Sequence, residues 1–462
     1  MDERTRRERS LWEDDRARAE ARAKKNAAIK KRKQQMKRRR IISMIVAIVL
    51  IFSLVSCGFK ACTSDKDQDN GSKKKANKKE EAVSISLLCV GDVMAHSPNI
   101  KGAYDDATGT YDFTRNYHDV TAYISEADLA LCNVETTFKG GNPSGYPLFN
   151  APDSLATALA GAGFDVAITA NNHMMDTGHD GMQRTLQVLR DAGMATVGSR
   201  YEGEKSYTVV EAEGVKIGVV AYTYETTFAG GSTTINGNPV YEKSESLINS
   251  FSYHDLESTD YARMQADIDG AKADGAEIIV CYFHWGEEYQ REPNMWQESV
   301  AVAAANMGAD VIFASHPHVL QGTDVLTTND GRSVPVFYSM GNFISNQRQE
   351  TLNNRYTEQG MIARVDIEYM KSTGEILSKT MSIVPTWVDK YGSGKPVYAI
   401  VPLDENLQYN YDLSLSGHMS RAQQALEDIR ALVGDELLSG KTILTGGQND
   451  DGTEQSGSQQ AA

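Results

Sequence analysis

The sequence predicts an α/β fold with two mixed β-sheets. Apolar runs typical of buried strands alternate with segments whose apolar residues recur at helical spacing, and this alternation is characteristic of α/β folds. One pair of strands, at 207–210 and 215–222, is joined by Glu213-Gly214 and predicts an antiparallel hairpin. Three later strands follow one another without intervening helices. We therefore expect mixed strand directions, and two sheets rather than one.

The predicted elements follow the chain in a regular order. Seven apolar runs that indicate strands begin at Ser84 (SISLLCV), Asp128 (DLALCN), Phe164 (FDVAITA), Val215 (VKIGVVAYT), Glu277 (EIIVCYF), Val311 (VIFAS) and Val334 (VPVFYSM). Helical patterns separate several of them, at 154–162, 182–192, 261–273 and 296–307. The later strands lie near 361–369, 376–384 and 396–402, and an amphipathic helix is predicted at 419–438.

The N-terminal part has the composition of a membrane anchor with its flank. Residues 1–40 carry 17 Lys and Arg against 7 Asp and Glu, whereas 41–59 carry no charge. This pattern predicts one transmembrane helix, with 1–40 in the cytoplasm and the rest of the chain outside the cell. Leu54-Val-Ser-Cys57-Gly also resembles a lipobox, so the alternative is a lipoprotein anchored at Cys57. In both cases the protein is expected at the cell membrane.

Composition also divides the rest of the chain. We expect a disordered linker at 60–82, a main domain at 83–402, a C-terminal helical extension at 403–445 and a disordered tail at 446–462. Residues 41–462 carry a net charge of −25, which disfavours nucleic acid as a partner. Cys89, Cys132 and Cys281 lie in apolar, strand-like runs and are expected to be small buried side chains.

Polar side chains suited to metal binding follow six of the apolar runs. The segments are Gly91-Asp92-Val-Met94, Asn133-Val-Glu135, Asn171-Asn172-His173, His284-Trp-Gly-Glu287, His316-Pro-His318 and Gly341-Asn342-Phe343. Each one alone has an ordinary explanation, such as a core histidine or a helix-capping carboxylate. Because ligands bind at the carboxyl edge of α/β sheets, we expect all six to share one site. Imidazole and carboxylate together suit Mn, Zn or Fe.

Other catalytic motifs are absent from the sequence. Gly434 to Thr442 has five residues between its glycines and follows a predicted helix, so it is not a P-loop. Gly161-Ala-Gly163 lacks the third glycine of a dinucleotide-binding motif. No Gly-x-Ser-x-Gly elbow and no His-Glu-x-x-His motif occurs.

In order along the chain, these motifs resemble the CapA family of bacterial poly-γ-glutamate capsule synthesis proteins. The matching series is Gly91-Asp92-x-Met94, Asn133-x-Glu135, Ala170-Asn-Asn-His-x-x-Asp176-x-Gly178, His284-Trp-Gly-x-Glu288-Tyr, His316-Pro-His318-x-x-Gln321 and Ser339-Met-Gly-Asn-Phe343. The family is similar to calcineurin-like metallophosphoesterases. The resemblance implies a four-layer α/β/β/α sandwich with one or two divalent metal ions at the strand edge.

The resemblance also implies a role for each candidate residue. The metal ligands would be Asp92, Glu135, Asn172, His284, His316 and His318, with His173 and Asp176 catalytic and with Asn133, Asn171, Glu287 and Asn342 in contact with substrate. Met94 departs from the superfamily, which has a histidine ligand there. The implied function is the synthesis, export or anchoring of poly-γ-glutamate or another anionic surface polymer by a metal-dependent hydrolase, with capsule synthase subunits as partners. The alternative is a non-catalytic polymer-binding or scaffold subunit of a capsule synthase complex.

Overall fold

The computed structural model describes residues 82–227, 233–252 and 260–444, which belong to one compact unit, Lys79–Ala462. The predicted cytoplasmic segment, the membrane anchor with Cys57, nearly all of the linker and the C-terminal tail lie outside the described residues. Within the described ranges, no helix combines the length and the apolar content needed to cross a bilayer.

The first sheet is built around the apolar run that begins at Ser84. In spatial order its strands are β20 (Val397–Pro402), β19 (Glu375–Tyr391), β18 (Gln359–Met370), β1 (Ala82–Val93), β4 (Leu129–Val134), β5 (Val166–Ile168) and β6 (Ala195–Val197), with β17 (Asn342–Ile344) on β1 and β21 (Lys441–Leu444) on β19. Strands β1, β4, β5 and β6 are parallel, whereas β18, β19 and β20 join antiparallel. The prediction of mixed strand directions is confirmed.

The second sheet contains the remaining long apolar runs. Its order is β12 (Ser250–Phe251), β8 (Val215–Tyr224), β13 (Ile278–His284), β14 (Val311–Ser315), β16 (Ser333–Phe337) and β15 (Thr323–Thr327), with β7 (Thr208–Ala212) on β8. Strands β7 and β8 form the predicted antiparallel hairpin. Glu213 and Gly214 both have positive φ, 51° and 72°, as a two-residue type I′ turn requires.

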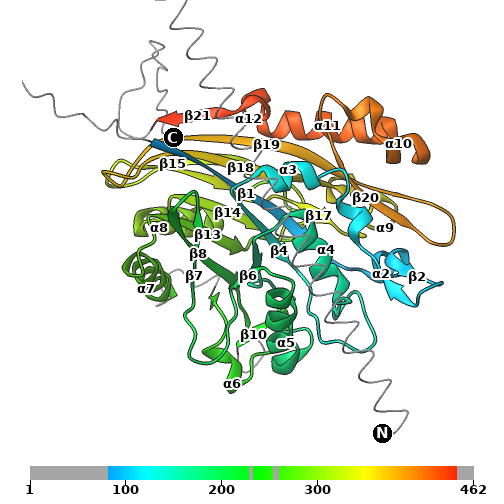
Figure 1. Cartoon of the computed structure of the whole chain (residues 1–462), viewed down its shortest axis with the longest axis horizontal. Coiled ribbons are helices and arrows are strands. Elements are labelled where there is room, and N and C mark those ends of the chain that lie inside the picture. Colours follow the sequence, from blue (N-terminus) through cyan, green and yellow to red (C-terminus); the bar gives the residue numbers. More distant parts are fainter. Residues whose placement is uncertain (1–81, 228–232, 253–259, 445–462) are drawn as a thin grey trace, which may run out of the picture. The chain divides into compact units, whose positions relative to one another are not determined.

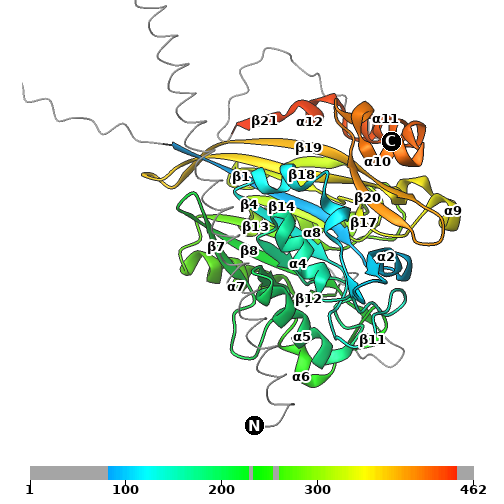
Figure 2. The ribbon, with the colours of Figure 1, turned by 45° about the vertical axis from the view of Figure 1, so that its right-hand side comes forward.

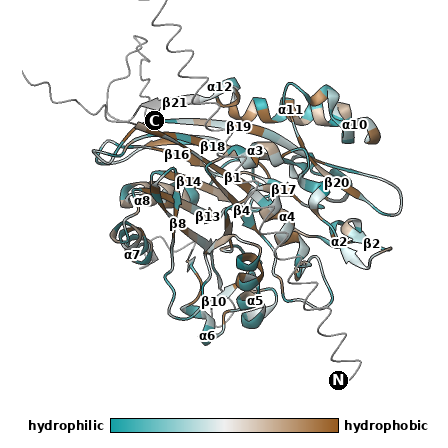
Figure 3. Cartoon of the chain, in the orientation of Figure 1, coloured by the Kyte–Doolittle hydropathy of each residue, from teal (hydrophilic) through white to brown (hydrophobic). Residues whose placement is uncertain are grey.

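Side-chain alternation on the strands makes the two sheets pack face to face. On β1, Ile85, Leu87 and Cys89 point into the core that the sheets share, whereas Leu88 and Val90 point to the opposite face. Figure 3 shows the hydrophobic residues concentrated along these strands. Cys89, Cys132 and Cys281 are buried free thiols, as expected.

Helices cover the outer face of each sheet (Figure 1). On the first sheet they are α2 (Ser97–Ala103), α3 (Thr121–Glu126) and α4 (Ser154–Ala162), and on the second α7 (Asp260–Ala273) and α8 (Met295–Met307). Helix α5 (Gly178–Asp191) also contributes Leu189 to the core on the outer face of the first sheet. The remaining described α-helices and strands outside the C-terminal segment are α6 (Glu242–Glu245), α9 (Gln349–Leu352), β2 (Tyr104–Asp105), β3 (Thr110–Tyr111), β9 (Thr226–Thr227), β10 (Thr233–Ile235) and β11 (Asn238–Pro239). The described residues therefore stack as helices, sheet, sheet and helices.

The segment after β20 packs along β19 (Figure 2). It contains α10 (Tyr411–Ser416), α11 (Met419–Val433), α12 (Asp435–Ser439) and β21. The single helix predicted at 419–438 is wrong, because Gly434 takes a φ of 78° between α11 and α12. Ala425 and Ile429 of α11 share the central core with Trp387 of β19. Residues 403–444 are thus continuous with the main core.

A buried ion-pair network ties α11 to this core. Glu358 is 2% exposed and lies 3.2 Å from Arg348 Nε and 2.7 Å from Arg421 Nη2, and it accepts a hydrogen bond from Trp387 Nε1 at 3.1 Å. Arg348 is also 2% exposed. A carboxylate with two guanidinium partners therefore sits in a poorly solvated place, where losing its charge is costly.

We predict that Glu358→Gln lowers the free energy of unfolding by about 1.5–3 kcal/mol, the range for hydrogen bonds to charged groups. Glu350→Gln is the matched control, because Glu350 contacts the same two arginines but is 58% exposed. Glu350→Gln should lower the free energy of unfolding by less than about 1 kcal/mol. Urea unfolding of both variants gives the comparison, and equal losses would contradict the assignment.

Candidate metal centre

The register of the strands brings the candidate residues to one edge. Asp92 of β1 lies opposite Asn133 of β4, and Asn133 lies opposite Ile168 at the end of β5. In the second sheet, His284 at the end of β13 lies opposite Ser315, the last residue of β14. The side chains at the ends of these strands come from both sheets and contact one another in one cluster.

Gly91 is a glycine because two backbones meet there. A Cβ atom at this position would lie 1.9 Å from the carbonyl oxygen of Gly341. The backbone N–H of Asp92 donates to that same oxygen at 3.0 Å. The Gly-Asp pair thus lets β1 lie against β17 and places the Asp92 side chain in the cluster.

Three ligand atoms converge around His284. Its Nε2 atom lies 3.1 Å from Asn172 Oδ1 and 3.1 Å from His316 Nδ1. Adjacent ligands of an ion bound at 2.0–2.2 Å are separated by about 3 to 3.5 Å, so this spacing suits a metal. Burial lowers the pKa of His284 to about 3, and burial also lowers the pKa of His316 well below its usual value. Both imidazoles are therefore neutral, the form in which they bind a metal.

Glu135 is the residue that most clearly requires a cation. It is fully buried, and neither carboxylate oxygen has a hydrogen-bond partner. Oε1 lies 3.7 Å from His284 Nε2, 3.9 Å from His318 Nε2 and 4.0 Å from His173 Nε2. Burial, followed by the charge of Asp92, raises the pKa of Glu135 well above its ordinary value. A carboxylate without donors among three imidazoles is costly unless a metal ion lies between them.

Two overlapping groups can supply such an ion with ligands. Glu135 belongs to both: one group adds His316 and His318, and the other adds Asp92 and His284. In each group the ligand atoms lie within 4.8 Å of one another and every residue is buried. The donor set of imidazole and carboxylate fits a divalent transition metal.

Asp92 and His318 form a buried pair beside this cluster. Asp92 Oδ2 lies 3.0 Å from His318 Nδ1, and Asn133 Nδ2 donates to Oδ1 at 2.8 Å. Burial opposes both charges, but the hydrogen bond between the two groups lowers the pKa of Asp92 and raises the pKa of His318. Asp92 therefore holds the His318 ring with Nε2 toward Glu135, as carboxylates do behind metal-binding histidines.

His173 and Asp176 form a second pair on the turn between β5 and α5. His173 Nδ1 lies 2.8 Å from Asp176 Oδ2, and its Nε2 faces Glu135. Asp176 is itself held, since it accepts hydrogen bonds from the Phe149 backbone N–H at 2.7 Å and from Asn238 Nδ2 at 3.2 Å. The carboxylate thus orients an imidazole whose other nitrogen points into the cluster.

Three of the asparagines that the sequence assigns to substrate contact are buried and hydrogen-bonded within the cluster. The amide of Asn133 bonds Asp92 and Asn171, and Asn171 also bonds the backbone of His173. Asn342 contacts His318 Nδ1 and donates to the carbonyl of Thr357. Because these amides are buried and engaged, they position the cluster. Glu287 is exposed on the loop after β13.

The backbone at the His316-Pro-His318 segment is in an uncommon conformation. His316 has a φ of 109° and His318 a φ of 57°, values that residues other than glycine rarely adopt. Such conformations persist where the surroundings enforce them, typically at functional sites. Here they let two histidines, two residues apart, both face the same carboxylate.

Sequence reasoning missed two aromatic residues beside the cluster. The ring of Tyr224, at the end of β8, lies 4.7 Å from that of His316 and stacks with His284 at 6.3 Å. The ring of Phe149 contacts that of His173 edge-on at 4.6 Å. Tyr224 directly follows the apolar run predicted at 215–223 and could have been found by that position. Phe149 lies in a loop with no such signal.

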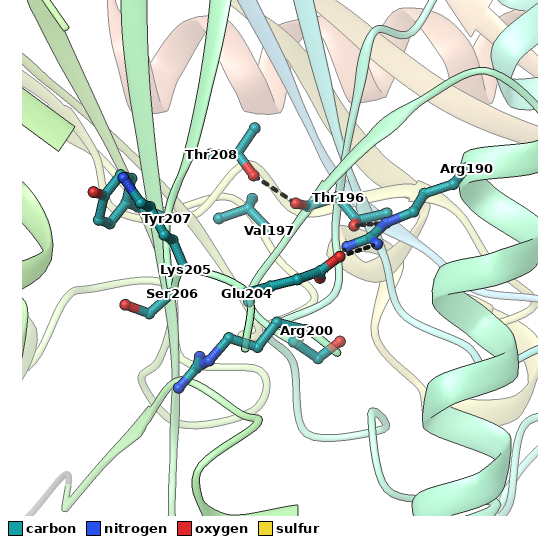
Figure 4. Close-up of a pocket in the computed structure, with 11 residues that line it drawn as sticks. Arg190, Thr196, Val197, Arg200, Glu204, Lys205, Ser206, Tyr207 and Thr208 are labelled. Atoms are coloured by element: carbon teal, nitrogen blue, oxygen red, sulfur yellow. Dashed lines mark hydrogen bonds and ion pairs between the residues drawn. The ribbon is translucent and has the colours of Figure 1, made fainter. Parts of the chain in front are cut away.

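A separate polar cavity of about 210 Å³ lies beside the connection from β6 to β7 (Figure 4). Two of the cationic side chains that line it have acidic partners. Arg190 makes two hydrogen bonds of 2.8 Å to Glu204, and Lys205 pairs with Asp274. No candidate metal ligand lines this cavity, so we assign it no part in the metal centre.

Comparisons with known proteins agree with the motif series. Residues 86–347 match the family described as "Bacterial capsule synthesis protein PGA_cap". The chain is 27% identical over 363 residues to the capsule biosynthesis protein CapA of Bacillus anthracis, covering 76% of this chain and 79% of that protein. It is 30% identical over 187 residues to the PGA biosynthesis protein CapA of Bacillus subtilis (strain 168), covering 40% and 43%.

Similar solved structures include one titled as a novel phosphatase of Mycoplasma pneumoniae. The match has 14% identity and a TM-score of 0.37, and it covers 66% of this chain and 95% of that one. A protein of Thermus thermophilus matches with 10% identity and a TM-score of 0.31, covering 64% and 97%.

Proposed function

Because this chain belongs to the PGA_cap family of bacterial capsule synthesis proteins, we propose that it serves capsule biosynthesis as a metal-dependent hydrolase of the metallophosphoesterase type. Its substrate would be poly-γ-glutamate or another anionic surface polymer, or a precursor of one. The observation that carries the proposal is the Glu135 carboxylate, buried without a hydrogen bond among three imidazoles.

The residues that would hold one or two Mn, Zn or Fe ions are Asp92, Glu135, Asn172, His284, His316 and His318. Glu135 is central, since it belongs to both ligand groups. The Asn172, His284 and His316 side chains already converge at 3.1 Å. A bound metal would supply Lewis-acid activation of a water molecule or of a polymer nucleophile.

His173 would move the proton in this reaction. Its Nδ1 is held by Asp176 and its Nε2 faces the cluster, so Nε2 is the atom that can take or give a proton at the substrate. Phe149 packs edge-on against the ring and helps to fix its plane. The pair therefore has the arrangement of an oriented general acid or base.

A second candidate function is a polymer-binding or scaffold subunit with a structural metal. The observation that favours it is burial, because Asp92, Glu135 and His284 are fully inaccessible and His316 and His318 are 3% and 2% exposed. A closed centre of this kind is typical of structural metal sites. Capsule synthase subunits would then be the partners.

Hydrolysis of bis-p-nitrophenyl phosphate by the full-length protein in detergent distinguishes the two candidates. For the hydrolase we expect Mn²⁺-dependent turnover that EDTA abolishes. A protein that binds the metal tightly, unfolds at lower temperature without it and shows no turnover would support the scaffold instead.

We also propose that the chain is anchored in the cell membrane by residues 41–59, with the capsule-synthesis domain outside the cell. The support is the uncharged segment behind a strongly basic flank. A phosphatase reporter fused after Glu80 should be active outside the cell, and activity only in fusions before Arg40 would contradict this. Loss of a metabolic lipid label in Cys57→Ala would favour the lipoprotein form.

A further inference from the structure

His96 lies beside the candidate centre and has no role in the function proposed above. It follows β1 and is partly exposed, unlike the buried histidines of the cluster. Its ring meets Phe149 edge-on at 5.0 Å, and Phe149 meets His173 in the same way at 4.6 Å. One aromatic ring thus contacts both the proposed proton carrier and His96, and His96 lies toward solvent.

The hydrogen bond to His96 determines which of its nitrogens can act. The backbone N–H of Asn346 donates to Nδ1 at 3.2 Å. Because Nδ1 accepts this hydrogen bond, it carries no proton and the ring is neutral. With Nδ1 accepting, the proton lies on Nε2, and among the described residues Nε2 makes no hydrogen bond.

This arrangement disfavours His96 as a metal ligand. A histidine that binds a metal through one nitrogen usually donates from the other to an acceptor. His318 meets that condition, since its Nδ1 faces the Asp92 carboxylate. The Nδ1 of His96 faces a donor instead, so binding a metal through Nε2 would require a ring without any proton.

A short segment positions His96 together with the cluster. Asn342 contacts Nδ1 of His318 at 3.2 Å, and four residues later Asn346 holds His96. Gln347 donates to Tyr289 Oη at 3.4 Å, and the Tyr289 ring lies 6.2 Å from that of His318. Residues 342–347 therefore set the position of His96 relative to His318 and Tyr289.

We propose that His96 Nε2–H donates a hydrogen bond to an anionic oxygen of the substrate, beside the metal cluster and without binding the metal. This inference rests on the proposed function, because it takes the cluster as the substrate site. The ligand chemistry is a phosphoryl or carboxylate oxygen.

The test measures metal content and anion affinity separately. Full-length protein in detergent is loaded with Mn²⁺, its metal content is measured by mass spectrometry, and its Kd for orthophosphate and for γ-glutamylglutamate is measured by calorimetry. The variants are His96→Phe, which keeps a ring beside Phe149, and His96→Gln, which keeps an N–H donor. His118→Gln is the control, because His118 is 83% exposed and pairs with Asp119.

We expect unchanged metal content in every variant. His96→Phe should weaken the Kd for at least one probe about tenfold or more, the effect of losing a hydrogen bond to a charged group. His96→Gln should recover part of the loss, and His118→Gln should have no effect. The probe that responds shows whether the oxygen is phosphoryl or carboxylate.

Three results would overturn the inference: loss of metal in His96→Phe, unchanged affinity for both probes, or binding of neither probe by the metal-loaded native protein. Absence of metal from the native protein would instead count against the proposed function, so the two failures are distinguishable.

Discussion

Replacing His316 by alanine is expected to empty the tightest metal position, with a loss of affinity above about 100-fold. Changes behind a metal ligand already cost about 10–100-fold, and His316 lies at the convergence with Asn172 and His284, where its Nδ1 is 3.1 Å from His284 Nε2. The native protein should retain about one tightly bound metal ion. Titration with Mn²⁺ and metal analysis after dialysis measure both quantities.

Asp92→Ala is the informative comparison for this prediction. Asp92 belongs to the other ligand group, with Glu135 and His284, and its two oxygens also bond His318 and Asn133. Its loss should therefore leave the position at His316 largely filled, with the metal affinity there reduced only about tenfold. Met94, two residues after Asp92, carries a thioether, a poor ligand for a hard cation, so it adds no strong ligand on this side. Loss of all metal in Asp92→Ala, or two equally tight ions in the native protein, would show that the ligands are divided differently.

His173→Asn should lower the kcat for an activated phosphodiester by about 10²–10⁴-fold, the usual contribution of a positioned general acid or base. Its Nδ1 bonds Asp176 and its Nε2 faces Glu135 at 4.0 Å, so the substitution removes the proton carrier but no convergent ligand. Metal content should remain unchanged. Turnover is measured at saturating Mn²⁺ over a range of substrate concentrations.

In the same assay, Asp176→Asn distinguishes the effect of orienting the His173 ring from the effect of proton transfer by His173. It keeps the shape of the partner but replaces an acceptor by an amide, which should lower kcat by a smaller factor than His173→Asn. His118→Asn is the control on the surface. If His173→Asn loses its metal together with its activity, His173 is a ligand and the proton-transfer role is wrong.

The local sequence pattern was enough to predict the elements that are marked by apolar runs or by apolar residues at helical spacing. The apolar runs beginning at Ser84, Val215 and Glu277 became β1, β8 and β13, and the helix predicted at 154–162 has the observed bounds. The Glu213-Gly214 turn also followed from its residues. The three-residue strand β6 and the four-residue strand β21 were missed, because short strands depend on their neighbours more than on their own sequence.

For the candidate centre, the sequence by itself determined the inventory: carboxylates, amides and imidazoles at the ends of buried strands, which must meet if the strands are parallel. The tertiary structure decided which groups each of these side chains contacts. It left Glu135 without a donor, set Asp92 behind His318, and engaged Asn133 with groups 38 to 151 residues away. Spacing along the chain carries no information on such contacts, because they depend on the register between strands and on the packing of two sheets against each other.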